Sequence, residues 1–215
     1  MQRVSEFAKA KGISRGRAYR LARSGVLPVR ELNDGSIILE DAAMAWQPRH
    51  ARPLSPRMAW LLLGMLDGEI PAGVRDAERS RLKGHVKGVR EAENPAHVLA
   101  QKVSARAQLH VFFAHPEDAA EMRDDERIAL SGVGAPGSGM MAGDVVEGYV
   151  APSVIEKVKR DFLLHEQADG NVRLRVAEVR EPGKAAIAAD LADWGRAREM
   201  REANRIIHEL LQEKC

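Results

Sequence analysis

The chain has 215 residues, 45% of them hydrophobic and 30% charged, a composition that supports a packed core and excludes wholesale disorder. Its longest apolar run, Met58 to Leu66, is too short to cross a bilayer, for which a helix needs about 20 residues. The single cysteine, Cys215, excludes a disulfide framework or a thiol-based zinc site within one chain.

Charge is unevenly distributed along the chain. The net charge is +2, but residues 1–52 carry ten Lys or Arg against five Asp or Glu, whereas the remainder is slightly acidic. This segregation predicts an anionic partner for the N-terminal part. Aromatic residues make up only 4%, which argues against a stacking platform for single-stranded nucleic acid. The N-terminus lacks the features of a secretory signal and no membrane span is predicted, so we expect a cytoplasmic protein.

Two short helices are predicted within the first 25 residues. Ser5 is a candidate N-cap for the first helix, and Ser14 is a candidate N-cap for the second. A three-residue turn joins them, which is the spacing of a helix-turn-helix. One face of the second helix is apolar at i, i+3 and i+4 and is predicted to pack on the first, through Ala18, Leu21 and Ala22.

The other face of the second helix is basic. Residues 11–28 contain five Lys or Arg and no Asp or Glu. Arg15 lies in the first turn, where the helix dipole disfavours a cation unless an anion docks there. We predict DNA contacts along this segment, from Ser14, Arg15, Arg17, Tyr19, Arg20 and Arg23. The alternatives are a merely solvated basic face and, for Tyr19, packing on the segment that follows.

Residues 29–32 and 36–39 are strand-like around Asn-Asp-Gly, a strong hairpin turn, and residues 40–46 are predicted to form a short helix. The stretch VSEFAKAKGISRGRAYRLARSGVLPVRELNDGSIILEDAAMAW resembles the winged helix-turn-helix of the excisionase and MerR-like DNA-binding families. In those families the second helix reads the major groove, and the wing touches the backbone or minor groove. The resemblance implies base readout by Arg15, Arg17, Tyr19 and Arg20, and wing contacts by Arg30, Asn33, Asp34 and Ser36.

The segment 47–56 contains three prolines and is predicted to be a linker. Its Arg49, His50 and Arg52 either follow the DNA backbone or belong to an inert connection. We therefore expect a DNA-binding domain over 1–48, a linker over 49–54 and an α+β interaction domain over 55–215.

The larger domain is predicted to mix helices and strands. Ser55 caps a helix that begins at Pro56. Further helices are predicted over 74–92, 95–104, 117–123, 185–194 and 196–213, and a strand over 107–115. LLHEQADGNVRLRVAEV is predicted to form a hairpin that turns at Asp169–Gly170, with a half-buried second strand. The fold class is thus α+β.

No catalytic constellation is found in the sequence. GVGAPG, residues 132–137, matches the dinucleotide-binding fingerprint, but no strand precedes it and no helix follows, so residues 131–143 are predicted to be a flexible loop. His110 and His115 are five residues apart on a predicted strand and face opposite sides. The acids between residues 117 and 126 are predicted to be solvated. We expect no enzyme and no cofactor.

NVRLRVAEV, followed by AAIAADLADWGRAREMREANRIIHELL, resembles the tail of bacterial antitoxin regulators encoded beside nucleotidyltransferase-like toxins of the abortive-infection E type. Asp190, Leu191, Ala192, Arg196 and Arg198 occupy the matching positions. The resemblance implies a regulator that represses its own operator and neutralises a toxin through the larger domain. A homodimer on DNA is expected because one small module buries too little surface for tight specific binding. The alternatives are an excisionase-like architectural DNA-binding factor, a ligand-sensing larger domain, and a tail that is only a core helix pair.

Overall fold

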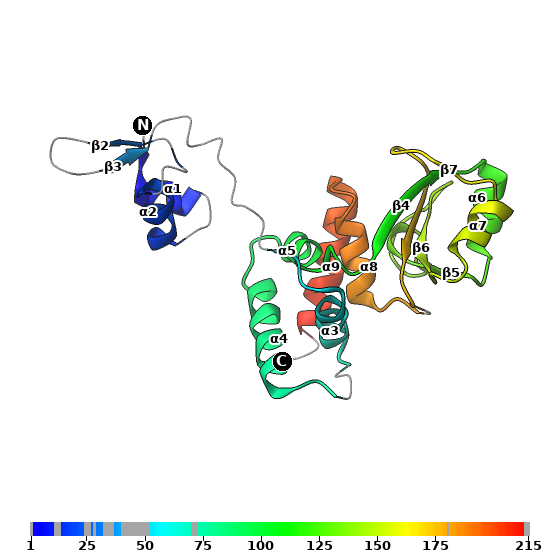
Figure 1. Cartoon of the computed structure of the whole chain (residues 1–215), viewed down its shortest axis with the longest axis horizontal. Helices are drawn as coiled ribbons and strands as arrows, with labels where there is room; N and C mark the ends of the chain where they lie inside the picture. The colour runs from blue at the N-terminus through cyan, green and yellow to red at the C-terminus, as the bar shows by residue number, and fades with distance from the viewer. Residues whose placement is uncertain are drawn as a thin grey trace. The chain divides into compact units, whose positions relative to one another are not determined.

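The structure is a computed structural model, which describes residues 2–10, 14–23, 27, 29–31, 37–39, 52–69, 73–179 and 181–212. The chain divides into two compact units, Met1–His50 and Ala51–Cys215, which are described separately below (Figure 1). Helices and strands occur in both units, so the expected α+β class is confirmed. Each helix within the described residues is too short or too polar to cross a membrane.

The first unit pairs two helices with a small antiparallel sheet. The helices are α1 (Val4–Ala10) and α2 (Arg15–Arg23). The strand order is β1 (Gln2–Arg3), β3 (Ile37–Leu39) and β2 (Val29–Glu31). The second helix begins directly after Ser14 as expected, and β2 pairs with β3 as the hairpin pattern predicts. The tip of this hairpin and the helix expected over 40–46 lie outside the described residues.

The start of α1 differs from the prediction. The helix begins at Val4, one residue before the expected N-cap, so Ser5 is inside it. Instead, the side chain of Glu6 accepts a hydrogen bond from the backbone N–H of Arg3 at 3.1 Å. A carboxylate in the first turn both satisfies a free backbone donor and suits the helix dipole. The core of this unit consists of Val4, Phe7, Ala8, Ala18, Leu27 and Leu39.

The second unit contains a layer of five helices. The predicted cap of the first one is confirmed, because the side chain of Ser55 accepts from the N–H of Met58 at 3.4 Å. A continuous apolar core joins these helices. They are α3 (Pro56–Asp67), α4 (Asp76–Arg90), α5 (Pro95–Val103), α8 (Lys184–Ala192) and α9 (Ala197–Gln212).

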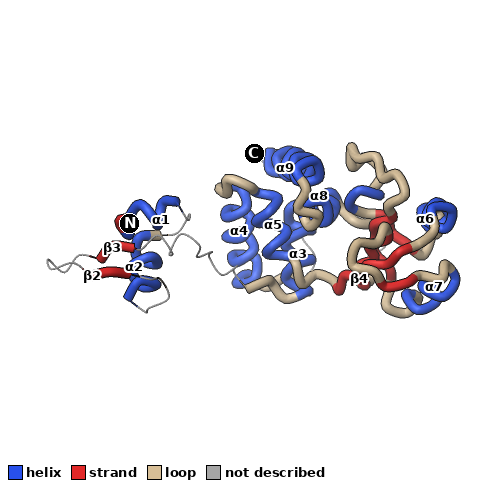
Figure 2. Tube along the Cα trace, turned by 90° about the horizontal axis from the view of Figure 1, so that it is seen from above, coloured by secondary structure: helices blue, strands red, loops and turns tan. Residues whose placement is uncertain are grey.

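The helical layer covers one face of a five-stranded sheet. Two more helices, α6 (Pro116–Arg123) and α7 (Ile155–Asp161), lie on the other face (Figures 1 and 2). The second face has its own apolar core, which includes Phe112, Met122 and Leu174. The strand order is β5 (Ile128–Leu130), β6 (Val146–Val150), β8 (Val172–Val176), β4 (Gln108–Phe113) and β7 (His165–Glu166). Strands β6 and β8 run parallel, and the other described neighbours in this sheet are antiparallel.

The predicted hairpin around Asp169–Gly170 is wrong. Its two arms, β7 and β8, do not pair with each other, because both pair with β4, which lies between them. Gly170 passes so close to β4 that a Cβ on it would lie 2.0 Å from the carbonyl oxygen of Phe112. The turn residues therefore carry the chain past a neighbouring strand, a contact that only a glycine permits.

The segment expected to be a flexible loop is in part a buried element. Ser131, Gly132 and Val133 are buried, and Gly132–Gly134 forms a short 3-10 turn called η2. The prediction also missed the strands on either side of this segment, β5 and β6. The backbone of η2 packs against Glu147 on β6, which explains why the sequence needs small residues there.

Candidate nucleic-acid interface

The exposed side of α2 carries a row of basic side chains. Arg15, Tyr19 and Arg23 follow one another at i, i+4 and i+8, so they lie along one line of the helix. Arg20 lies beside this line, and all four residues are exposed to solvent. Tyr19 keeps 44% of its surface accessible, so its ring is available on the same face.

The orientation of α2 is fixed by small apolar residues on its opposite side. Ala18 and Ala22 are buried, and Leu21 is partly buried against the core of the unit. Small side chains let two helices approach closely, and their i, i+4 spacing faces them toward α1. The burial of these positions turns the arginine row outward.

The cations of this row have no acidic partner within the described residues. No hydrogen bond or ion pair there engages the side chain of Arg15, Arg20 or Arg23, and the first turn of α2 holds no acid. On α9, by contrast, the arginine Arg205 has acidic partners, because it pairs with Glu202 at 2.5 Å and with Glu209. Uncompensated guanidinium groups on one helix face produce a positive potential over that face.

The remaining predicted contacts are only partly described. Arg30 is exposed on β2, where it pairs in register with Ile38. Ser14 is exposed and directly precedes α2. The side chain of Arg17 lies outside what is described, as do the hairpin-tip residues Asn33, Asp34 and Ser36.

The second unit contains a buried ionic network that was not predicted from the sequence. Its centre is Asp190 on α8, which is fully buried. One carboxylate oxygen accepts from Arg106 and from the hydroxyl of Tyr149 at 3.0 Å, and it forms an ion pair with Arg175 at 3.0 Å. The other oxygen accepts from the hydroxyl of Ser131. These contacts tie the sheet to the helical layer.

A second buried carboxylate, Glu147 on β6, completes the network. It accepts from Arg175 at 2.8 Å, from the backbone N–H of Val133 at 3.0 Å and from the indole N–H of Trp194 at 2.8 Å. Arg175 also donates to Asp193 at 3.1 Å. Because the chain's own donors occupy both oxygens of Glu147, the arrangement is suited to fixing the position of α8 on the sheet.

The electrostatics of the two carboxylates differ. Burial opposes ionisation of Asp190, but Arg175 and Arg106 outweigh it and hold its pKa below the ordinary value. Burial raises the pKa of Glu147, and Arg175 offsets this only in part. Burial, reinforced by Asp190, also raises the pKa of Tyr149. Asp190 is therefore the ionised carboxylate that the guanidinium groups of Arg106 and Arg175 both contact.

The strand predicted to be half-buried, which is β8, carries one sequence signal of this network. Arg173 and Arg175 alternate with apolar residues in β8, a pattern that usually places the arginines in solvent. Instead, Arg175 is buried under α8. The aspartate that receives it, Asp190, lies in a helix of alanines and leucine, where a buried charge has no sequence periodicity to reveal it.

Comparisons of the chain with protein families, with curated proteins and with solved structures yield no match. Among the described residues, no group of three or more His, Cys, Asp or Glu side chains is arranged to hold a metal ion.

Proposed function

We propose that the first unit binds duplex DNA through the exposed face of α2, and that the chain is a cytoplasmic transcriptional regulator. The observation that supports this most strongly is the row of Arg15, Arg20 and Arg23, exposed together and without acidic partners in the described residues. A purely solvated helix face commonly mixes both signs of charge, as α9 does.

The dimensions and chemistry of α2 suit the major groove. An α-helix fits this groove, and arginine makes a bidentate contact with the edge of guanine or a charge-assisted hydrogen bond with phosphate. Tyr19, in the same row, offers a hydroxyl and a flat ring to the backbone or a base edge. Arg30 on β2 is exposed and offers a second cationic contact to the phosphates.

The resemblance of the C-terminal tail supports a more specific proposal: the chain represses its own operator as a homodimer and neutralises a nucleotidyltransferase-like toxin. Asp190 of that tail is committed to the buried network, whereas Arg196 and Arg198 are exposed. The guanidinium of Arg196 lies over the ring of Trp194, 4.8 Å from its centroid, so Arg198 is the more available of the two for a partner. Co-purification of the neighbouring gene product with the full chain tests this proposal. A partner-free protein expressed from its native operon contradicts it.

The DNA-binding proposal is tested by fluorescence anisotropy with a duplex from the region upstream of the chain's own gene. Arg15→Ala, Arg20→Ala and Arg23→Ala are each expected to weaken binding, by about 1–3 kcal/mol where the arginine contacts a base. Arg81→Ala on α4 is the matched control, because it removes one exposed cation from the second unit and leaves α2 intact. Unchanged affinity in all three α2 variants refutes the proposal.

A further inference from the structure

The second unit contains a cavity of about 410 Å³ between the end of α3 and the segment that enters α8. The α3 wall consists of Trp60, Leu63, Gly64 and Asp67, whose i, i+3, i+4 and i+7 spacing puts them on one helix face. The opposite wall includes Glu178, Val179, Glu181, Gly183 and Ala186. The volume lies within the range of small-molecule sites.

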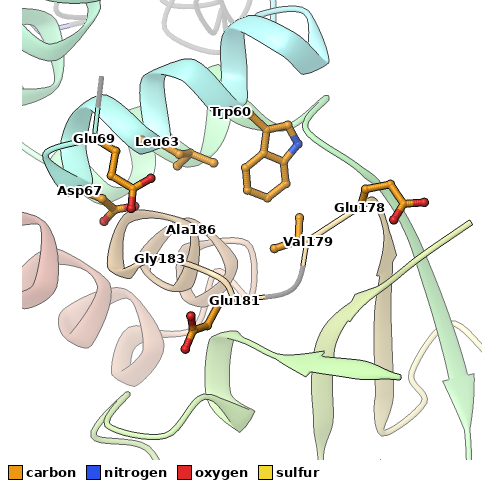
Figure 3. A pocket seen from close by; sticks show the side chains of 10 residues that line it. Trp60, Leu63, Asp67, Glu69, Glu178, Val179, Glu181, Gly183 and Ala186 are labelled. Atoms are coloured by element: carbon orange, nitrogen blue, oxygen red, sulfur yellow. The ribbon is translucent and has the colours of Figure 1, made fainter. Parts of the chain in front are cut away.

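The cavity combines an apolar floor with acidic ends. Trp60 and Val179 lie in its middle, with Asp67 and Glu69 to one side and Glu178 to the other (Figure 3). Trp60 and Asp67 are seven residues apart on α3, which corresponds to a rise of about 10 Å along the helix. The polar side chains among the described lining residues are all carboxylates, and none of these residues is Lys, Arg or His.

The acidic residues that line the cavity differ in their contacts with the rest of the chain. Asp67 accepts a hydrogen bond from the N–H of Ala185 at 2.8 Å, and its other oxygen lies against Gly183, where a Cβ would come within 2.2 Å. It therefore joins the end of α3 to the start of α8. Glu69 and Glu178 are exposed, and no hydrogen bond or ion pair within the described residues engages either side chain.

Two contacts fix the orientation of the Trp60 indole. Its N–H donates to the carbonyl oxygen of Arg106 at 3.0 Å, and its ring meets the edge of Tyr149 with 5.4 Å between centroids. Because the N–H is already satisfied, the ring offers the cavity only its apolar and π surface. Such a surface attracts methylene groups and organic cations, and it does not select for anions.

We propose that this cavity binds a linear aliphatic polyamine. Its methylene segments would lie on Trp60, Leu63 and Val179, and its ammonium groups would meet Glu69 at one end and Glu178 at the other. Glu69 and Glu178 lie on opposite sides of the apolar floor (Figure 3), so the ligand needs an ammonium group at each end of its chain. A triamine or tetraamine is favoured over a short diamine because it brings more methylene groups to the apolar floor and carries more positive charge toward the carboxylates. A compact metal cation leaves the apolar floor unused, and a neutral apolar ligand leaves the carboxylates unpaired.

The test is isothermal titration calorimetry of spermidine into the full chain at physiological salt, without DNA. We expect one binding site and weaker binding of putrescine. The double variant Glu69→Gln/Glu178→Gln is expected to weaken spermidine binding roughly tenfold, since each partly exposed ion pair contributes about three- to fivefold. Asp67 is left unchanged because it supports the start of α8.

The matched control is Glu117→Gln/Glu121→Gln, which removes two exposed carboxylates from α6 on the far side of the sheet. This control is expected to bind spermidine within about twofold of the wild-type chain. An Arg15→Ala/Arg20→Ala/Arg23→Ala variant is also expected to bind normally, which separates this site from the DNA-binding proposal. No spermidine binding, equal loss in both double variants, or equal competition by Mg²⁺ overturns the inference.

Discussion

Asp190→Asn tests the role of the buried network most sharply. The substitution preserves volume but removes one of the carboxylates that face Arg106 and Arg175, both of which are almost completely buried. Removing one partner of a buried ion pair costs about 3–5 kcal/mol, because the remaining charge stays desolvated. In a unit of this size, each kcal/mol lowers the melting temperature by about 2–4 °C. We therefore expect a decrease of roughly 6–20 °C in the transition of the second unit.

The assay is urea denaturation followed by circular dichroism, together with a calorimetric scan of the full chain. Asp124→Asn is the control, because Asp124 is exposed at the end of α6 and is expected to change the free energy of unfolding by less than about 0.5 kcal/mol. A loss below about 1 kcal/mol for Asp190→Asn would refute the view that this carboxylate holds the helical layer to the sheet.

Three further predictions concern pH, a glycine and the first core. The folded pKa of Asp190 lies below its ordinary value, so the stability that its ionised form contributes is complete above about pH 4 and is lost as the pH falls through the folded pKa. The pKa of Glu147 is raised, so its contribution to stability has the opposite pH dependence. Acid titration of the free energy of unfolding should consequently show a shallower decline for Asp190→Asn than for wild type, and equal slopes contradict this. Gly132→Ala should destabilise the second unit by at least about 2 kcal/mol, because φ is +52° and the new Cβ would lie 2.0 Å from the Glu147 carboxylate. Gly84→Ala, in open space on α4, should instead stabilise by about 0.5–1 kcal/mol in the same urea assay. Phe7→Ala should cost about 3–5 kcal/mol and unfold the first unit alone, which proteolysis would detect as cleavage before residue 51.

The sequence predicted elements best where local signals define their ends. Ser55 with Pro56, and Ser14 before a basic amphipathic segment, placed the starts of α3 and α2 correctly. The pairing of β2 with β3 followed from two short strand-like runs on either side of Asn-Asp-Gly, a strong turn signal. These signals act over a few residues, so one sequence is enough to detect them.

The prediction failed for features that depend on packing between residues far apart in the sequence. Nothing near Asp169–Gly170 reveals that β4 separates β7 from β8, since that pairing joins residues about 60 positions apart. The buried network likewise depends on Arg106, Glu147 and Asp190, which lie in three segments far apart in the sequence. The arginine face of α2 was predictable because the same nine residues supply both its apolar and its basic side.

The salt dependence of DNA binding tests the proposed function most directly. Anisotropy titrations at several salt concentrations give the slope of log affinity against log salt, and each phosphate contact contributes about −0.9 to that slope. The variant Arg15→Ala/Arg20→Ala/Arg23→Ala is predicted to bind more weakly and with a slope reduced in magnitude by roughly one to three, while Arg81→Ala matches wild type. An identical slope and affinity in wild type and the triple variant would contradict the assignment of α2 as the DNA-binding helix.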